Sequence, residues 1–223
     1  MEVREYGNRD ARTVLLQPVG GYEDELTERE FAAIRERVAD DFRLVTFAVE
    51  DWNRDLSPWE APAVFGKEGF GSGAEDTLRE ILTYCDDGTK AYYLGGYSLA
   101  GLFALWAAYQ TDRFRGIAAA SPSVWFPGFI EYMKEHEIRT GRVYLSLGNR
   151  EEKARNPVMA TVGDRIREAH ALLRERGIDC TLEWNEGNHF ADADQRTANA
   201  FAWVMRGGCS RTDTHFSLCE YRG

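Results

Sequence analysis

Apolar segments of strand length alternate with longer segments of mixed polarity along most of the chain. Five of these apolar runs lie at residues 13–17, 43–49, 91–95, 116–120 and 142–147. Runs that are apolar on both faces are typical of parallel strands buried between layers of helices. A sixth run, at 178–184, alternates apolar and polar residues, which predicts a strand near the edge of the sheet. The pattern therefore predicts an α/β fold with a mostly parallel central sheet flanked by helices.

The intervening segments carry apolar residues at helical spacing. They predict helices at residues 27–38, 73–82, 102–109 and 159–173, and a last helix that ends near 205. The sequence Thr27-Glu28-Arg29-Glu30 has the form of a capping box, so the first helix is predicted to begin at Thr27. The segment 50–72 is rich in glycine and aromatic residues and is expected to form a surface loop over a site.

The length of the chain suits one domain with a complete core. The 223 residues are expected to form a single unit over 1–223, with a core at about 13–205 and a polar C-terminal tail at 206–223. The formal net charge of -10 disfavours nucleic acid or an anionic membrane surface as a partner, because both reward basic patches. No apolar run approaches the roughly 20 residues of a membrane helix, and the first residues do not resemble a signal peptide, so a cytoplasmic location is expected.

The four cysteines are scattered, at Cys85, Cys180, Cys209 and Cys219. They lack the close pairing of a zinc site, and no cluster with histidine accompanies the acidic residues, so no metal is expected. Cys209 and Cys219 are near enough in sequence to be considered as a pair, but closeness in sequence is weak evidence for a disulfide and two unpaired thiols are favoured.

A candidate nucleophile stands between the run at 91–95 and the apolar segment at 102–109. The sequence there is Gly96-Tyr97-Ser98-Leu99-Ala100, in which small residues lie two positions before and two positions after the serine. A sharp turn from strand to helix exposes a nucleophilic serine and leaves no room for side chains at those two positions. The alternative is that Ser98 is simply the N-cap of the helix.

Partners for this serine are expected where other strands end, because the carboxyl ends of parallel strands meet at one edge of a sheet. The loop after 142–147 supplies Glu151 and Glu152, and the loop after 178–184 supplies His189. An imidazole takes the proton of a serine hydroxyl, and a carboxylate fixes the tautomer of the imidazole and stabilises its cation. The order serine, acid, histidine leaves either glutamate as the acid.

Taken together, these motifs resemble the α/β-hydrolase superfamily, and within it the esterase branch that includes esterase D and enterochelin esterase-like proteins. The resemblance covers about 13–205 and rests on the serine turn, Ser121-Pro122-Ser123-Val124-Trp125, the Gly-x-x-Glu loop ending at Glu151 and the Gly-x-His-Phe loop around His189. It implies a compact α/β-hydrolase fold without a large lid domain, and a triad of Ser98, Glu151 and His189. Glu151 is preferred because it stands three after the glycine, and Glu152 is the alternative.

The expected function is that of a serine esterase that forms an acyl-enzyme and needs no cofactor. Leu99 is expected to supply one backbone N–H to an oxyanion hole. Gly20, chosen over Val19 and Gly21, is expected to supply the second backbone N–H. The His-Gly that is usual in the family at the end of the first strand is replaced here by Gln17-Pro18. Trp52 and Trp125 are expected to touch a small-molecule ester. The alternatives are acyl transfer by the same triad and a non-catalytic binding protein that retains the fold. The sequence does not indicate an oligomeric state.

Overall fold

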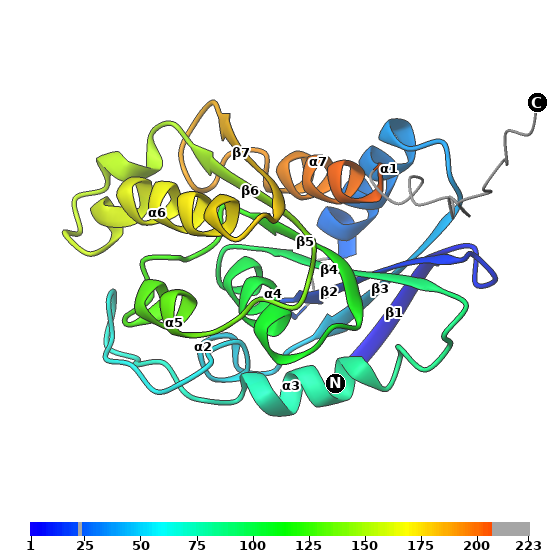
Figure 1. Ribbon diagram of the computed structural model, residues 1–223, viewed down its shortest axis with the longest axis horizontal. Coiled ribbons are helices and arrows are strands. Elements are labelled where there is room, and N and C mark those ends of the chain that lie inside the picture. Colours follow the sequence, from blue (N-terminus) through cyan, green and yellow to red (C-terminus); the bar gives the residue numbers. More distant parts are fainter. Residues whose placement is uncertain (22–23, 207–223) are drawn as a thin grey trace, which may run out of the picture.

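A mixed sheet forms the centre of the molecule, in a computed structural model that describes residues 1–21 and 24–206 (Figure 1). Within this part of the chain the sheet has seven strands in the order β1-β3-β2-β4-β5-β6-β7. The strands are β1 (Glu2–Gly7), β2 (Thr13–Val19), β3 (Phe42–Ala48), β4 (Ala91–Tyr97), β5 (Phe114–Ala120), β6 (Arg142–Gly148) and β7 (Asp179–Asn185). Strands β2 to β7 pair in parallel. The six predicted strands and the edge position of β7 are confirmed.

Strand β1 is an element that the sequence analysis missed. It pairs antiparallel with β3 over the whole of its length, from Glu2 opposite Ala48 to Gly7 opposite Arg43. Its residues are half-buried or exposed, so its place depends on the backbone ladder with β3 more than on burial of side chains. The ordered fold therefore begins before the expected core at residue 13.

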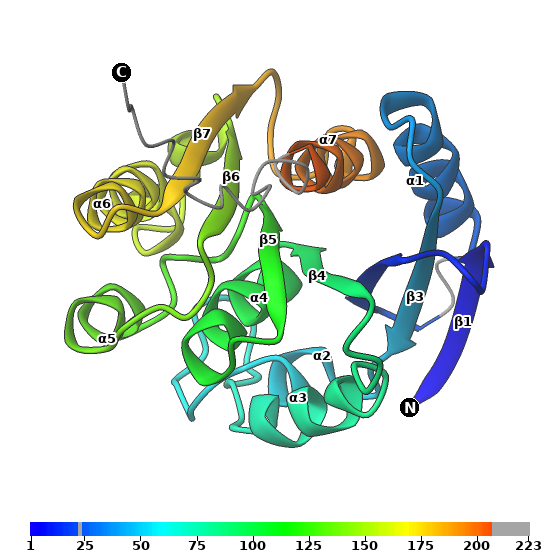
Figure 2. The same ribbon diagram turned by 45° about the vertical axis from the view of Figure 1, so that its right-hand side comes forward.

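Helices cover both faces of the sheet (Figure 2). Those named here are α1 (Asp24–Arg37), α2 (Trp52–Asp55), α3 (Ala74–Leu82), α4 (Leu99–Gln110), α5 (Phe129–Glu135), α6 (Val162–Glu175) and α7 (Ala193–Met205), together with the short 3-10 turns η1 (Glu151–Lys153) and η2 (Met159–Thr161). Helices α1 and α7 pack side by side on one face, around Ile34 and Phe201. Helices α3, α4, α5 and α6 contribute to the core on the other face, where Phe103 is fully buried.

The start of α1 corrects one prediction. The helix begins at Asp24, so Thr27 and Glu30 lie inside it and do not form an N-terminal capping box. Both residues are buried, and Glu30 accepts a hydrogen bond from Gln17 Nε2 at 3.1 Å. Within the polar pattern that suggested a helix start, Glu30 therefore contacts the sheet.

The longest connection between strands runs from β3 to β4 and contains α2, an extended stretch and α3. No separate domain is inserted between strands in the part of the chain that the structure describes, in agreement with a compact fold without a large lid. The expected tail at 207–223, with Cys209 and Cys219, lies outside the described residues. Cys85 and Cys180 are free thiols, Cys85 buried and Cys180 half-buried.

Candidate active site

The turn from β4 into α4 holds Ser98 in a strained backbone conformation. Ser98 has φ 58° and ψ −119°, a region that L-residues rarely adopt. A Cβ atom at Gly96 would lie 2.6 Å from the Cβ atom of Ala100 and 2.9 Å from its carbonyl carbon. These two positions therefore have to be small, as the sequence predicted, because the strand and the helix approach each other so closely.

Two hydrogen bonds connect Ser98 to a histidine and an acid. His189 Nε2 is 2.9 Å from Ser98 Oγ, and His189 Nδ1 is 2.7 Å from Glu151 Oε2. The three side chains come from loops after β4, β7 and β6, so the sheet brings their carboxyl ends together. An ionised carboxylate only accepts hydrogen bonds, so Nδ1 carries the proton and Nε2 is left to accept from the serine hydroxyl.

The other carboxylate oxygen of Glu151 is held by three donors. Oε1 accepts from the Gly148 N–H at 2.7 Å, from Ser121 Oγ at 2.9 Å and from Arg196 Nη1 at 3.0 Å. Burial raises the pKa of Glu151, but the hydrogen bonds and charge of His189 and the donors Gly148 and Ser121 outweigh it, so the pKa lies below its ordinary value of 4.5. Glu151 is therefore an ionised group near neutral pH, although it is buried.

Glu152, the alternative acid, points away from His189 and toward α6. Its carboxylate pairs with Arg167 of α6, with Arg167 Nη2 3.1 Å from Glu152 Oε2. Of the two neighbouring glutamates, the structure thus brings Glu151 to His189 and Glu152 to the outside of α6.

Tyr97, directly before the serine, holds the backbone of the histidine loop. Its hydroxyl donates to the carbonyl oxygen of His189 at 2.8 Å and accepts from Arg196 Nη1 at 3.1 Å. Its ring lies against the imidazole, with 5.2 Å between the ring centroids. Burial raises the pKa of Tyr97, so its hydroxyl remains a donor over the usual pH range.

The sequence analysis did not single out Tyr97, Ser121 or Arg196. For Arg196 a signal was present, because this charged residue falls on the same stripe of α7 as Ala200 and Val204, which are buried in the core. A charge on the apolar side of an amphipathic helix requires a partner in the interior.

Ser98 opens onto a surface cavity of about 620 Å³. Its lining residues come from α1, α2, β4 and the segment that leads into α7: Leu26, Arg29, Trp52, Tyr97, Ser98, His189, Phe190, Asp192, Ala193 and Asp194. Phe190 is 89% exposed and stands next to the imidazole. Trp52 thus lies where the sequence placed it, and Phe190 adds a second aromatic surface.

The structure places Trp125 in a different environment. Its ring contacts those of Phe65 and Phe70 edge-on, with centroid distances of 6.2 Å and 6.0 Å. Trp125 therefore packs in an aromatic cluster formed with the segment between α2 and α3.

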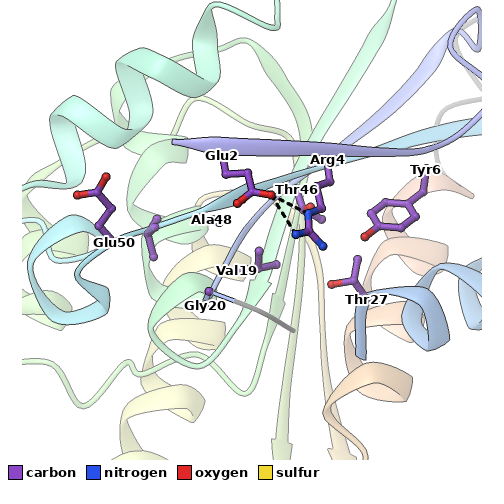
Figure 3. Close-up of a pocket in the computed structure, with 11 residues that line it drawn as sticks. Glu2, Arg4, Tyr6, Val19, Gly20, Thr27, Thr46, Ala48 and Glu50 are labelled. Carbon is purple, nitrogen blue, oxygen red and sulfur yellow. Dashed lines mark hydrogen bonds and ion pairs between the residues drawn. The ribbon is translucent and has the colours of Figure 1, made fainter. Parts of the chain in front are cut away.

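The two candidate oxyanion donors lie in different settings. Leu99 is the first residue of α4, so its N–H belongs to the group at a helix start that has no acceptor within the helix. Gly20 follows β2 and lines a second cavity, of about 380 Å³, together with Val19 (Figure 3). Figure 3 shows Val19 across the pocket from Arg4 of β1, with Gly20 beside Val19, and Tyr6 of β1 across from Thr27 of α1. The structure brings Leu99 next to Ser98 and places Gly20 at this neighbouring cavity.

The described residues contain neither a cluster of metal-ligating side chains nor a helix that could cross a membrane. Residues 1–21 and 24–206 contain no group of three or more histidine, cysteine, aspartate or glutamate side chains placed to hold a metal ion. In the same ranges, no helix has the length and apolar character needed to cross a membrane.

Solved structures of the same architecture identify the fold. The siderophore hydrolase EstA from Aspergillus nidulans is 20% identical, with a TM-score of 0.66 over 91% of this chain and 86% of that one. An IroE-like serine hydrolase from Shewanella oneidensis is 14% identical, with a TM-score of 0.71 over 96% and 78% of the two chains. The chain has the α/β-hydrolase fold.

Sequence comparison adds another similar protein. An uncharacterized protein of Bacillus subtilis (strain 168), YbbA, is 21% identical over an alignment of 183 residues, and the match covers 72% of this chain and 73% of that protein. No family model matches the sequence. The likeness to the α/β hydrolases is therefore one of fold, and the chemistry has to be argued from the site.

Proposed function

We propose that the protein is a serine hydrolase that cleaves carboxylic esters, with Ser98 as nucleophile, His189 as general base and Glu151 as the acid that orients the imidazole. The observation that carries this proposal is the continuous pair of hydrogen bonds, 2.9 Å and 2.7 Å long, from the strained Ser98 through His189 to a buried carboxylate. A serine that served only as a helix cap would need neither the strain nor the histidine.

The reaction follows from the placement of these atoms. Ser98 Oγ attacks the ester carbonyl while His189 Nε2 takes its proton, and the imidazolium then gives that proton to the leaving alcohol. Water attacks the resulting acyl-enzyme with His189 again as base, and the free acid leaves. The Leu99 N–H is the first donor to the oxyanion, and a backbone N–H of the loop after β2, at Gly20, is proposed as the second.

The cavity supports a small-molecule ester as substrate. Its aromatic surfaces, Trp52 and Phe190, lie beside polar groups that include Arg29 and Asp194, which pair with each other at 3.2 Å. Such a mixture suits an ester with an apolar or aromatic part and a polar part. Two proteins with this fold, EstA and the IroE-like protein, are described as a siderophore hydrolase and a serine hydrolase, which supports ester cleavage for this chain as well.

The test compares the native protein with Ser98→Ala on a panel of p-nitrophenyl esters of short to medium acyl chains. We expect turnover by the native protein and a loss of about a thousandfold or more in the variant. Labelling by a fluorophosphonate probe should disappear in Ser98→Ala and persist in Ser123→Ala, which removes a second hydroxyl 3.3 Å from Ser98 Oγ. Equal turnover by native protein and Ser98→Ala, or no labelling of the native protein, would reject the proposal.

A further inference from the structure

Arg196 is a buried cation beside the proposed triad. It lies on α7 with 2% of its surface exposed. Its Nη1 donates to Glu151 Oε1 at 3.0 Å and to the Tyr97 hydroxyl at 3.1 Å, and its Nη2 donates to the carbonyl oxygen of Glu186 at 2.9 Å. One guanidinium thus contacts the acid, the tyrosine that holds the histidine loop, and the loop itself.

Stability alone is a weak explanation for this pair. The side chains of Arg196 and Glu151 are 3% and 5% exposed, so both charges have given up their hydration. The attraction within a buried ion pair often only offsets that loss, and apolar side chains of similar volume usually stabilise a fold equally well. Glu151 also has two further donors for Oε1, Gly148 and Ser121, so its hydrogen bonding does not depend on the arginine. The contribution to Glu151 that these two neutral donors cannot make is a positive charge.

We propose that Arg196 is a positioning residue of the hydrolase reaction, which balances the charge of Glu151 and holds Oε1 so that Oε2 faces His189. The inference rests on the proposed function, in which His189 gains and then releases a proton. Beside a bare carboxylate the imidazolium would be held too strongly, whereas beside a neutral ion pair it can pass its proton to the leaving alcohol. Arg196 also fixes the ring indirectly, through Tyr97 and the Glu186 carbonyl.

Other charged and titratable groups face this site from every side. Around the ring and the cavity they are Arg29 of α1, Tyr97 of β4, and Asp192 and Asp194 at the start of α7; beyond the acid, Tyr144 of β6 donates to Glu183 of β7. Among these side chains, only Tyr97 is hydrogen-bonded to the Arg196 guanidinium, so the effect of the others is expected to be common to all variants compared.

The experiment measures the pH dependence of kcat/KM for native protein, Arg196→Gln and Arg196→Lys. In Arg196→Gln the acid limb should move to higher pH by about one unit, because the uncompensated carboxylate makes the Glu151–His189 pair easier to protonate. The value of kcat should also fall about ten- to a hundredfold through loss of alignment. In Arg196→Lys, which keeps the charge but loses the fork of donors, the acid limb should stay near its native position while kcat still falls.

A second readout does not require turnover. The protonation midpoint of the Glu151–His189 pair is followed by NMR of the His189 ring, assigned with His189→Gln among the four histidines of the chain. It should rise by about one pH unit in Arg196→Gln. If Arg196→Gln does not fold, Glu151→Gln is compared with the double variant Glu151→Gln/Arg196→Gln. Neither of these proteins contains the Glu151 carboxylate, so removing Arg196 leaves no buried carboxylate unpaired. The midpoint should be higher in the double variant.

The outcomes separate the two proposals. A native protein that hydrolyses esters, together with an unmoved midpoint in both comparisons, would overturn the role of Arg196 and leave the hydrolase intact. A shifted midpoint in a protein that hydrolyses no ester and takes up no fluorophosphonate would reject the proposed function while the charge balance remained. Equal acid-limb shifts in Arg196→Gln and Arg196→Lys would also overturn the inference, since charge would then not be the cause.

Discussion

The close approach of β4 and α4 makes Gly96→Ala a direct test of how Ser98, the proposed nucleophile, is held. The added Cβ atom would lie 2.6 Å from the Ala100 Cβ atom and 2.9 Å and 3.0 Å from the Ala100 carbonyl carbon and oxygen. Two of the three contacts are with backbone, which cannot rotate away, so the start of α4 has to move. Overpacking of this kind costs about 1–3 kcal/mol in the free energy of unfolding.

The same movement should reduce activity more than stability. Ser98 joins the two elements, and its Oγ is within 2.9 Å of His189 Nε2. A shift of about 1 Å at a reacting atom can lower turnover by about a hundredfold. We therefore expect Gly96→Ala to lose about a hundredfold in kcat/KM on the preferred p-nitrophenyl ester. The free energy of unfolding is measured on the same samples by urea titration, followed by tryptophan fluorescence.

Two controls make the result specific. Gly88→Ala adds a Cβ atom in open space, with nothing within 4 Å, and should leave both quantities near their native values. Gly96→Ala/Ala100→Gly removes the 2.6 Å contact but keeps the two backbone contacts, so it should recover part of the lost activity and show a coupling of about 0.5 kcal/mol or more. If Gly96→Ala kept its unfolding free energy within about 0.5 kcal/mol and its kcat/KM within about threefold, the reasoning on the turn would be wrong.

Three further predictions concern the acid and the cavity. Glu151→Gln should lower kcat by about ten-thousandfold through loss of the correct tautomer, whereas Glu152→Gln, which only breaks the exposed pair with Arg167, should stay within about twofold in the same ester assay. Against the effect of burial, hydrogen bonds hold the pKa of Glu151 below its ordinary 4.5. The part of the native protein's advantage over Glu151→Gln in unfolding free energy that comes from this charge should therefore be full above that pH and be lost as the pH falls through the lowered native pKa. An advantage that stays constant in acid urea titrations would contradict this. Trp52→Ala should raise KM about tenfold, while Trp184→Ala, an exposed tryptophan stacked on Arg167, should not change KM.

The central strands could be predicted because burial on both faces leaves a strong record in the sequence. Strands such as β4 and β6 are buried over most of their length, and a short run of apolar residues is typical of such strands. Strand β1 leaves no such record, since Val3 and Glu5 share one face and both are half-buried. Its pairing with β3 uses backbone groups, which every sequence carries.

Some residues of the candidate site could likewise be predicted from the sequence and others could not. Ser98, Glu151 and His189 stand at the ends of predictable strands, so their meeting could be inferred from topology. The place of Arg196 on the apolar stripe of α7 marked it as buried, but its partner could not be inferred, because that depends on how α7 rotates over the sheet. Trp125 was expected at the cavity, but loop conformations decide which aromatic residues face it, and no periodic pattern encodes them.

Helix α4 begins directly after the proposed nucleophile and is buried from Leu99 to Tyr109, whereas His189 follows the edge strand β7, whose residues are half-buried or exposed. Backbone amides of α4 should consequently exchange with solvent hydrogen only through global unfolding, while those around His189 should exchange through local opening. Mild denaturant should then open the loop that carries His189 while the turn from β4 into α4 is still folded. Inactivation should precede the loss of secondary structure, and it should reverse on dilution.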